Sequence, residues 1–581
     1  MTEQPPTEEP KFRLPIAFLE RKTELEAHTK NDLELSPLDP SGSLYKYVFN
    51  PETIFGAKTM GEWCKYYTAD VTFLKESQTL LKNKAACEHV SGETQRKVDA
   101  IWREIKSETG FNEKYNYLDW SKLNMLNNSA NFLQCLSLYN MAAPVLSLML
   151  PIFFLILPMF ILKMRGMPIT IEKYIELLKI VFKKHQLGQI FDISTVSFEK
   201  MVYILATTVF YVLQVYQNIM SCVRFYHNMA KIHYQLFTIR DYLSSTLKNM
   251  DALKSQCDGL KTYEPFLEHM KSHRDVCEVM LKDLKIIVPN KITIKKFTQI
   301  GHTMKCFYQL YNHSQFHETL EYSFGLNGYI DNLNGFRKNI ELKHVGSCSF
   351  KKANVKFKNA YFPSLVNQKP VKNSYKLDKH LLITGPNAAG KTTLLKTTIF
   401  NVILSQQLGY GFYKKANLLP YDRIHCYINI PDTSSRDSLF QAEAKRCKDI
   451  LDEIDATCQK DELSQKDGLR HFCVFDELYS GTNPYEAISS AYAFLKYLNK
   501  YDNVNFILTT HFLDLCRRLA ETKEMKNYHM RIDTTTGDFT YTYKMEKGIS
   551  YIKGGIKVLR DLDYPEEIIN VTNETLREME I

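Results

Sequence analysis

The sequence predicts an α plus α/β fold, in which a helical region over residues 50–344 precedes a C-terminal α/β domain with a mostly parallel sheet. Two observations carry this prediction. From residue 50 to 140 and from 224 to 340, apolar residues recur with the spacing of amphipathic helices. From about residue 345, short apolar strands alternate with helical stretches, as they do in parallel α/β sheets.

The composition is that of an ordinary globular protein. The 581 residues are 44% hydrophobic and 24% charged, which excludes wholesale disorder, collagen-like repeats and a channel built mostly from membrane helices. The net charge of +9 permits nucleic acid or an anionic membrane as a partner but requires neither. The 13 cysteines form no C-x-x-C pair, so we expect a reducing compartment and neither a disulfide framework nor a zinc knuckle.

The first 49 residues read as a tail and a lead-in to the helical region. The opening dozen residues are acidic and rich in proline, which is typical of a disordered segment. They contain neither a basic nor an apolar stretch, so we expect no cleaved secretory signal.

Two uncharged runs interrupt the helical region. Residues 141–162 are strongly apolar and long enough to cross a bilayer as a helix, and Lys163 and Arg165 follow as flanking charges. Residues 201–223 are also uncharged but include Gln214 and Asn218. We expect the first run to insert into a membrane, with a buried hairpin in a helical core as the alternative. The second run fits a membrane span and a buried core helix about equally well.

A strand pattern at 380–384 leads into Gly385-Pro386-Asn387-Ala388-Ala389-Gly390-Lys391-Thr392, and a helical stretch follows. This order matches the Walker A motif, G-x-x-x-x-G-K-[ST], in the context that the motif needs. Backbone N–H groups of the loop and the helix N-terminus would hold phosphates, with Lys391 at the β- and γ-phosphates and Thr392 on Mg²⁺. The candidate nucleotide-binding residues are Gly385, Pro386, Asn387, Ala388, Ala389, Gly390, Lys391, Thr392 and Thr393.

Two further strands end in residues that suit phosphate chemistry. Residues 472–475 are apolar and run into Asp476 and Glu477, a Walker B pattern in which Asp476 would hold Mg²⁺ and Glu477 would orient the attacking water. Residues 505–509 lead to Thr510 and His511, and His511 at this strand end can reach the γ-phosphate.

Together these motifs resemble the MutS family, the ATPases of DNA mismatch repair, over residues 345–581. Residues 438–443, Ser-Leu-Phe-Gln-Ala-Glu, resemble the family's S-x-F-x-x-E element, and the chain has no LSGGQ signature of ABC transporters. Residues 477–483 resemble the turn that follows Walker B in the family, and residues 371–374, with Asn373, resemble the segment near the adenine.

The resemblance implies a Mg²⁺-dependent, ABC-type ATPase domain over 345–545 and a helix–turn–helix dimerisation cap over 546–581. In the family this cap reaches over a partner subunit, so we expect a homodimer or heterodimer with composite sites. Ser438 would then contact the γ-phosphate bound by the opposite subunit, while a plain helix N-cap is the alternative reading of this serine.

The chain also departs from the family pattern. Ala388 and Ala389 stand where the family usually has Met-Gly, and Asp563 stands where it prefers glycine. If the family's core begins near residue 50, no room remains for a mismatch-reading domain.

The function that we expect is ATP hydrolysis that drives a DNA-binding clamp, in mismatch repair or related DNA maintenance. The expected location is a membrane with the ATPase domain facing the cytosol, or alternatively a soluble intracellular state. A rival interpretation keeps the ATPase but has it act on a membrane partner without DNA.

Overall fold

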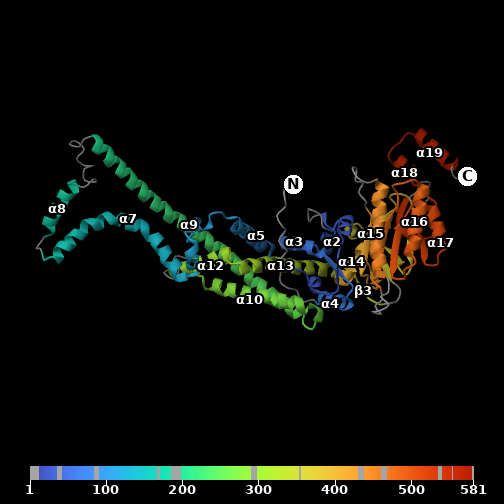
Figure 1. The fold of residues 1–581 in the computed structure, drawn as a ribbon, viewed down its shortest axis with the longest axis horizontal. Helices are drawn as coiled ribbons and strands as arrows, with labels where there is room; N and C mark the ends of the chain where they lie inside the picture. Colours follow the sequence, from blue (N-terminus) through green and yellow to red (C-terminus); the bar gives the residue numbers. More distant parts are fainter. Residues whose placement is uncertain are drawn as a thin grey trace. The chain divides into compact units, whose positions relative to one another are not determined.

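The computed structural model describes residues 12–35, 42–83, 90–166, 170–184, 198–289, 297–351, 355–428, 438–458, 468–533, 540–552 and 554–578. The chain folds into two compact units. The first comprises residues 1–92, 248–274 and 321–581, and the second comprises residues 93–247 and 275–320. Three long helices contribute residues to both units, namely α9 (Phe198–Gln256), α10 (Glu264–Ile286) and α13 (Ser314–Glu341) (Figure 1).

A six-stranded sheet forms the centre of the first unit, with the strand order β13-β12-β6-β11-β10-β9. Its five strands from β12 to β9 are parallel, and β13 pairs antiparallel with β12 at one edge. The strands are β6 (His380–Thr384), β9 (Arg423–Tyr427), β10 (His471–Asp476), β11 (Val504–Thr509), β12 (Met525–Asp533) and β13 (Thr540–Lys547). Because parallel strands end at the same edge, the residues after β6, β10 and β11 lie close together.

Three helices cover one face of this sheet through an apolar core, in which side chains such as Leu382, Phe475 and Leu508 pack against Ile454 and Leu495. These helices are α15 (Leu439–Cys458), α16 (Pro484–Leu498) and α17 (Leu513–Ala520) (Figure 1). Two further helices follow the sheet, α18 (Gly555–Asp561) and α19 (Glu566–Glu578), joined by a short turn.

Helix α14 (Lys391–Leu408) is buried on nearly all sides. A five-stranded sheet of order β5-β4-β8-β3-β7 belongs to the same unit, and β7 and β4 contact the helix. Its strands are β3 (Gly346–Ser349), β4 (Lys356–Ala360), β5 (Asn373–Lys376), β7 (Tyr410–Gly411) and β8 (Lys415–Asn417).

The N-terminal segment packs on the same helix. Two buried amides of α14 hold its backbone, because Gln406 donates to the carbonyl of Thr68 at 3.0 Å and Gln407 donates to the carbonyl of Trp63 at 2.7 Å. Buried amides without such partners would be costly, so these bonds fix the segment on the sheet domain. Its elements are β1 (Lys22–Glu24), β2 (Tyr66–Thr68), α1 (Ala27–Asp32), α2 (Tyr45–Phe49), α3 (Ile54–Trp63) and α4 (Val71–Lys82).

A network of charges joins the N-terminal segment to β9 and α15. Glu26 accepts from Arg446 at 2.8 Å and lies 3.4 Å from Nδ1 of His425. Glu453 also faces His425 and pairs with Arg423 at 2.6 Å. Glu26, His425 and Glu453 have the spacing of a metal site, but each carboxylate already has an arginine partner, so the cluster is explained as an ion-pair network.

This network makes Glu26 sensitive to acid. Burial alone would raise the pKa of Glu26, but hydrogen bonds and charge from His425 and Arg446 outweigh it and lower the pKa to about 2 from 4.5. A carboxylate with a lowered pKa stabilises the fold above its unfolded pKa, and this contribution is lost as the pH falls through the folded pKa.

We therefore expect Glu26→Gln to lower the free energy of unfolding at neutral pH, and the difference from wild type to shrink as the pH falls from about 4.5 to about 2. Urea denaturation at several pH values measures this. The matched control is Glu24→Gln, because the Glu24 side chain is 73% exposed. A pH-independent difference for Glu26→Gln would contradict the expectation.

The second unit is helical. It contains α5 (Gly92–Ser107), α6 (Phe111–Lys114), α7 (Ala130–Met164), α8 (Ile171–Lys184) and α12 (Ile300–Asn312), with parts of the three long helices. Helix α12 approaches α7 so closely that a Cβ on Gly301 would lie 2.1 Å from the carbonyl of Ala130. The backbone N–H of Gly301 donates to Gln134 on α7 at 2.8 Å, which satisfies a group near the start of α12.

The two uncharged runs lie in α7 and α9. The helices contact each other in this region, where Nδ2 of Asn218 donates to Oγ of Ser147 at 3.0 Å. Across the described residues, no helix combines the length and the apolar composition that a bilayer crossing requires. The predicted membrane spans at 141–162 and 201–223 are therefore not supported.

The expected combination of helical and mostly parallel α/β structure is confirmed. The proposed division at residues 50, 345 and 546 concerns functional domains and stays a prediction. The compact units differ from it, because the N-terminal segment and part of the helical region fold with the sheet domain.

Candidate functional site

The site begins where the fully buried strand β6 passes through a glycine loop into α14. Gly390 caps the helix with a φ of +92°, and Ala388 also has a positive φ of +61°. Glycine adopts this backbone region at no steric cost, whereas alanine does so less readily. The loop therefore places Lys391 and Thr392 in the first turn of α14.

Thr392 meets the end of β10. Its hydroxyl donates to Oδ2 of Asp476 at 2.7 Å. Thr509, which pairs with Asp476 in the parallel register of β10 and β11, donates to the other carboxylate oxygen. Two hydroxyls thus orient the Asp476 carboxylate toward the helix N-terminus.

Lys391, Glu477, His511 and Asn387 form one polar cluster. Nε2 of His511 lies 2.9 Å from Nζ of Lys391, 3.0 Å from Oε1 of Glu477 and 2.8 Å from Oδ1 of Asn387. Nε2 can either donate one hydrogen or accept one, so the three side chains compete for it. These distances show that the ends of β6, β10 and β11 meet at this cluster.

Both charged members of the cluster have altered pKa values. Burial lowers the pKa of Lys391, and the carboxylates of Glu477 and Asp476 only partly oppose this. The hydrogen bond from His511 lowers the pKa of Glu477, and the charges of His511 and Lys391 act in the same direction against burial. Glu477 is thereby kept ionised beside a cation whose side chain is only 5% exposed.

The backbone at Glu477 is also unusual. Its φ is +54°, and its N–H donates to the carbonyl of Thr509 at 3.0 Å. A non-glycine residue in this region is strained, and such strain is typically found at functional sites. The bond to Thr509 ties the strained residue to the neighbouring strand.

Residues from β13 and the following loop lie against the glycine loop. A Cβ on Gly390 would lie 3.1 Å from the ring of Tyr543, and a Cβ on Gly554 would lie 2.3 Å from Cβ of Pro386. Asn373, predicted near the adenine, accepts from the N–H of Met545 at 2.9 Å and donates to the carbonyl of Tyr543 at 3.0 Å. Tyr543 is not among the residues predicted from the sequence, because no motif marks a lone aromatic residue on an edge strand.

Ser438 precedes α15 and makes the contacts of a helix N-cap. Its hydroxyl accepts from the backbone N–H of Gln441 at 3.3 Å, and its own backbone N–H donates to Oε1 of Gln441 at 2.9 Å. Glu443, one turn later, accepts from the N–H groups of Ser480 and Gly481, each at 3.1 Å. Two sequence motifs, residues 438–443 and 477–483, are therefore joined by Glu443.

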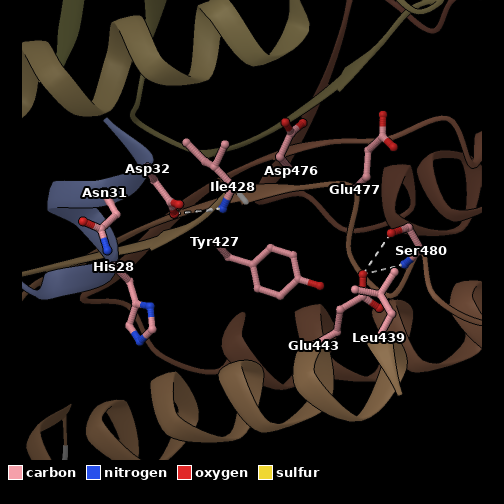
Figure 2. Close-up of a pocket in the computed structure, with 10 residues that line it drawn as sticks. All are labelled: His28, Asn31, Asp32, Tyr427, Ile428, Leu439, Glu443, Asp476, Glu477 and Ser480. Atoms are coloured by element: carbon pink, nitrogen blue, oxygen red, sulfur yellow. Dashed lines mark hydrogen bonds between the residues drawn. The ribbon is translucent and has the colours of Figure 1, made fainter. Parts of the chain in front are cut away.

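Asp476 and Glu477 line a cavity of about 510 Å³ (Figure 2). Glu477 also belongs to the polar cluster around His511. The remaining walls come from α1, the end of β9, the start of α15 and the loop after β10. The lining residues are His28, Asn31, Asp32, Tyr427, Ile428, Leu439, Glu443, Asp476, Glu477 and Ser480. The contribution of α1 could not be foreseen, since no motif in residues 27–32 indicates it.

The site combines a strand, a glycine loop and a buried lysine with an acidic pair and a histidine on adjacent strand ends. This combination resembles the phosphate-binding sites of P-loop proteins. Residues 381–580 match the family model of MutS domain V. This C-terminal part of the chain is therefore similar to MutS domain V.

Relatives that bear the name DNA mismatch repair protein MutS are consistent with this similarity. The protein of Bacteroides fragilis is 28% identical over 222 residues, which are 37% of this chain and 24% of the relative. The protein of Staphylococcus haemolyticus is 29% identical over 204 residues, which are 34% of this chain and 22% of the relative. The match thus spans about a quarter of the length of these relatives.

Proposed function

We propose that the protein is a Mg²⁺-dependent ATPase that hydrolyses ATP to ADP and phosphate and uses the reaction to switch a DNA-binding clamp. The observation that carries the ATPase proposal is the convergence of Lys391, Thr392, Asp476, Glu477 and His511 at the carboxyl ends of β6, β10 and β11. This edge is where ligands bind in open parallel sheets.

The chain's own groups suit a triphosphate. The N-terminus of the 18-residue helix α14 offers backbone N–H groups and the positive end of the helix dipole. Lys391 is buried, and its pKa is lowered because the charges of Glu477 and Asp476 do not fully offset the cost of burying its own charge. The negative charge of a bound phosphate would favour the charged form of this lysine. Thr393 is exposed on the first turn of α14 and is a further donor.

The pair of Thr392 and Asp476 suits Mg²⁺, because hydroxyl and carboxylate oxygens are the hard ligands that this ion prefers. When bound, Mg²⁺ neutralises charge that develops on the phosphate oxygens. Glu477 would orient and polarise the attacking water, and His511 would donate a hydrogen bond to the γ-phosphate.

The DNA-binding part of the proposal rests on the names of the relatives and on the net charge of +9. The test is ATP turnover by the full chain with and without duplex DNA, together with DNA affinity at rising salt. We expect DNA to change the turnover rate and affinity to fall linearly on a log–log plot against salt. If the chain turns over ATP but does not bind DNA at physiological salt, the proposed DNA-binding clamp is rejected and the proposed ATPase activity is retained.

We further propose that two chains form the active assembly, with residues 546–581 as the dimerisation cap and Ser438 serving the opposite site. The exposed hydroxyl of Ser438 and the N-terminus of α15 offer groups that suit a γ-phosphate. The N-cap contacts that Ser438 makes are compatible with this role, because the hydroxyl can accept from Gln441 and still donate.

Complementation separates the composite site from a plain N-cap. Ser438→Arg and Lys391→Ala are each expected to be inactive, yet a mixture should recover part of the ATP turnover, since one site of a mixed dimer has an intact lysine and an intact opposing serine. The measurement is turnover before and after mixing, with mixing verified by two different affinity tags. Absence of recovery in well-folded, verified mixed dimers would reject the composite site.

A further inference from the structure

Helices α7 and α9 contact each other in the second unit, and we call this pair the hairpin, although α8 lies between them in the sequence. Each of the two helices carries a long row of exposed apolar side chains. On α9 the row repeats every seven residues, and its central members are 48–67% exposed. These are Val202, Leu205, Val209, Val212, Tyr216 and Ile219. On α7 the members are 51–65% exposed and follow the same repeat: Tyr139, Leu146, Met149, Phe153, Ile156 and Phe160.

An apolar repeat of 3.5 residues on average is the signal of helices that pack with another helix along a left-handed seam. On α9, Val202, Val209 and Tyr216 alternate with Leu205, Val212 and Ile219 at spacings of three and four. One core position of the heptad is thus occupied by valine and tyrosine, and the other by leucine, valine and isoleucine.

The row does not serve the contact within the hairpin. Helix α9 contacts α7 through Asn218 and Cys222, whose Sγ lies 3.6 Å from the carbonyl of Met141. These residues lie roughly 110° around the helix from the exposed row, at 3.6 residues per turn. Helix α9 can therefore contact α7 and a further helix at the same time, as each helix of a four-helix bundle does.

The third side of α9 mixes polar side chains with the exposed aromatic residues Tyr203 and Phe210. Thr207, Gln214 and Ser221 follow one another at seven-residue intervals, opposite the apolar row. Gln214 and Ser221 are exposed to solvent.

We propose that the hairpins of two copies of this chain pack together through these rows as a four-helix bundle. The rows are self-complementary, as a two-fold interface requires. Residues 141–162 and 201–223 contain no charged side chain that would select a charged partner. An aromatic side chain buries about 150–250 Å², so Tyr139, Phe153, Phe160 and Tyr216, at 60–65% exposed, offer roughly 400–600 Å² toward the ~800 Å² per partner that specific dimers bury.

Cysteine cross-linking of the full chain tests this interface. Exposed Cys135 and half-buried Cys222 are first replaced by serine, since most of the other described cysteines are buried. Leu205→Cys and Val212→Cys then probe the row, and Gln214→Cys and Ser221→Cys are the matched controls on the opposite side. We expect a short thiol cross-linker to give several-fold more covalent dimer at the row than at the controls.

The second test uses a double variant, Leu205→Glu with Val212→Glu, which places charges in the row. Its control is the double variant Gln214→Glu with Ser221→Glu on the opposite side. We expect the first pair alone to abolish cross-linking through a cysteine placed at residue 209. Equal cross-linking at all four positions would show a dimer held elsewhere, for example through the ATPase domain, and would overturn the bundle. Protection of Leu205→Cys and Val212→Cys from thiol labelling only by phosphatidylcholine–phosphatidylglycerol vesicles, without cross-linking, would also overturn it and assign the rows to lipid.

Discussion

Lys391→Ala is expected to lower ATP turnover by roughly 10²–10³-fold, the loss typical when one preorganised donor to a developing charge is removed. Lys391 is the cation in the first turn of α14 and lies among His511, Glu477 and the carbonyl of Pro386. Without it, the phosphates would face the carboxylates of Asp476 and Glu477 without the opposing charge of Lys391. Steady-state turnover and nucleotide affinity measure the effect.

Lys396→Ala is the matched control for Lys391→Ala. It removes the same charge from the same helix, but Lys396 pairs with Glu34 at 3.5 Å, away from the strand ends. We expect the control to keep wild-type turnover and both variants to keep the wild-type circular dichroism spectrum. If a folded Lys391→Ala protein turns over ATP as fast as the Lys396→Ala protein does, the assignment of Lys391 to the site is wrong.

Glu477→Gln should retain ATP binding and slow hydrolysis by roughly 10²–10⁴-fold, the usual contribution of a positioned general base. The amide is nearly isosteric and leaves Asp476 and Thr392 in place, so the metal ligands survive. The lowered pKa of Glu477, which follows from the hydrogen bond and charge of His511, keeps the wild-type carboxylate ionised below the usual range of a glutamate. Single-turnover hydrolysis and equilibrium nucleotide binding separate the two effects.

A control for Glu477→Gln is Glu521→Gln, which makes the same change at an exposed position after α17. We expect unchanged binding and hydrolysis for this control. If Glu477→Gln hydrolyses ATP at the wild-type rate, the assignment of the acidic pair after β10 is wrong. If it loses binding as well, Glu477 instead supports the fold of the loop, as its bond to Thr509 allows.

The sequence alone determined the parts of the site that are local. Residues 380–392 predict strand, glycine loop and helix because a contiguous stretch specifies them through its apolar run, its glycines and its helix-forming residues. The acidic pair and His511 were found in the same way, since each directly follows an apolar strand. The distances around His511 show that these strand ends meet in the folded chain.

Only the tertiary structure decided which distant segments complete the sheet domain. The N-terminal segment joins α14 through Gln406 and Gln407, whose amide hydrogen bonds link residues more than 300 positions apart and leave no local pattern. Tyr543 reaches Gly390 only because β13 pairs with β12 beside β6. The apolar runs show a related limit, because contact with another helix and contact with lipid both favour uncharged side chains, so composition by itself cannot separate the two.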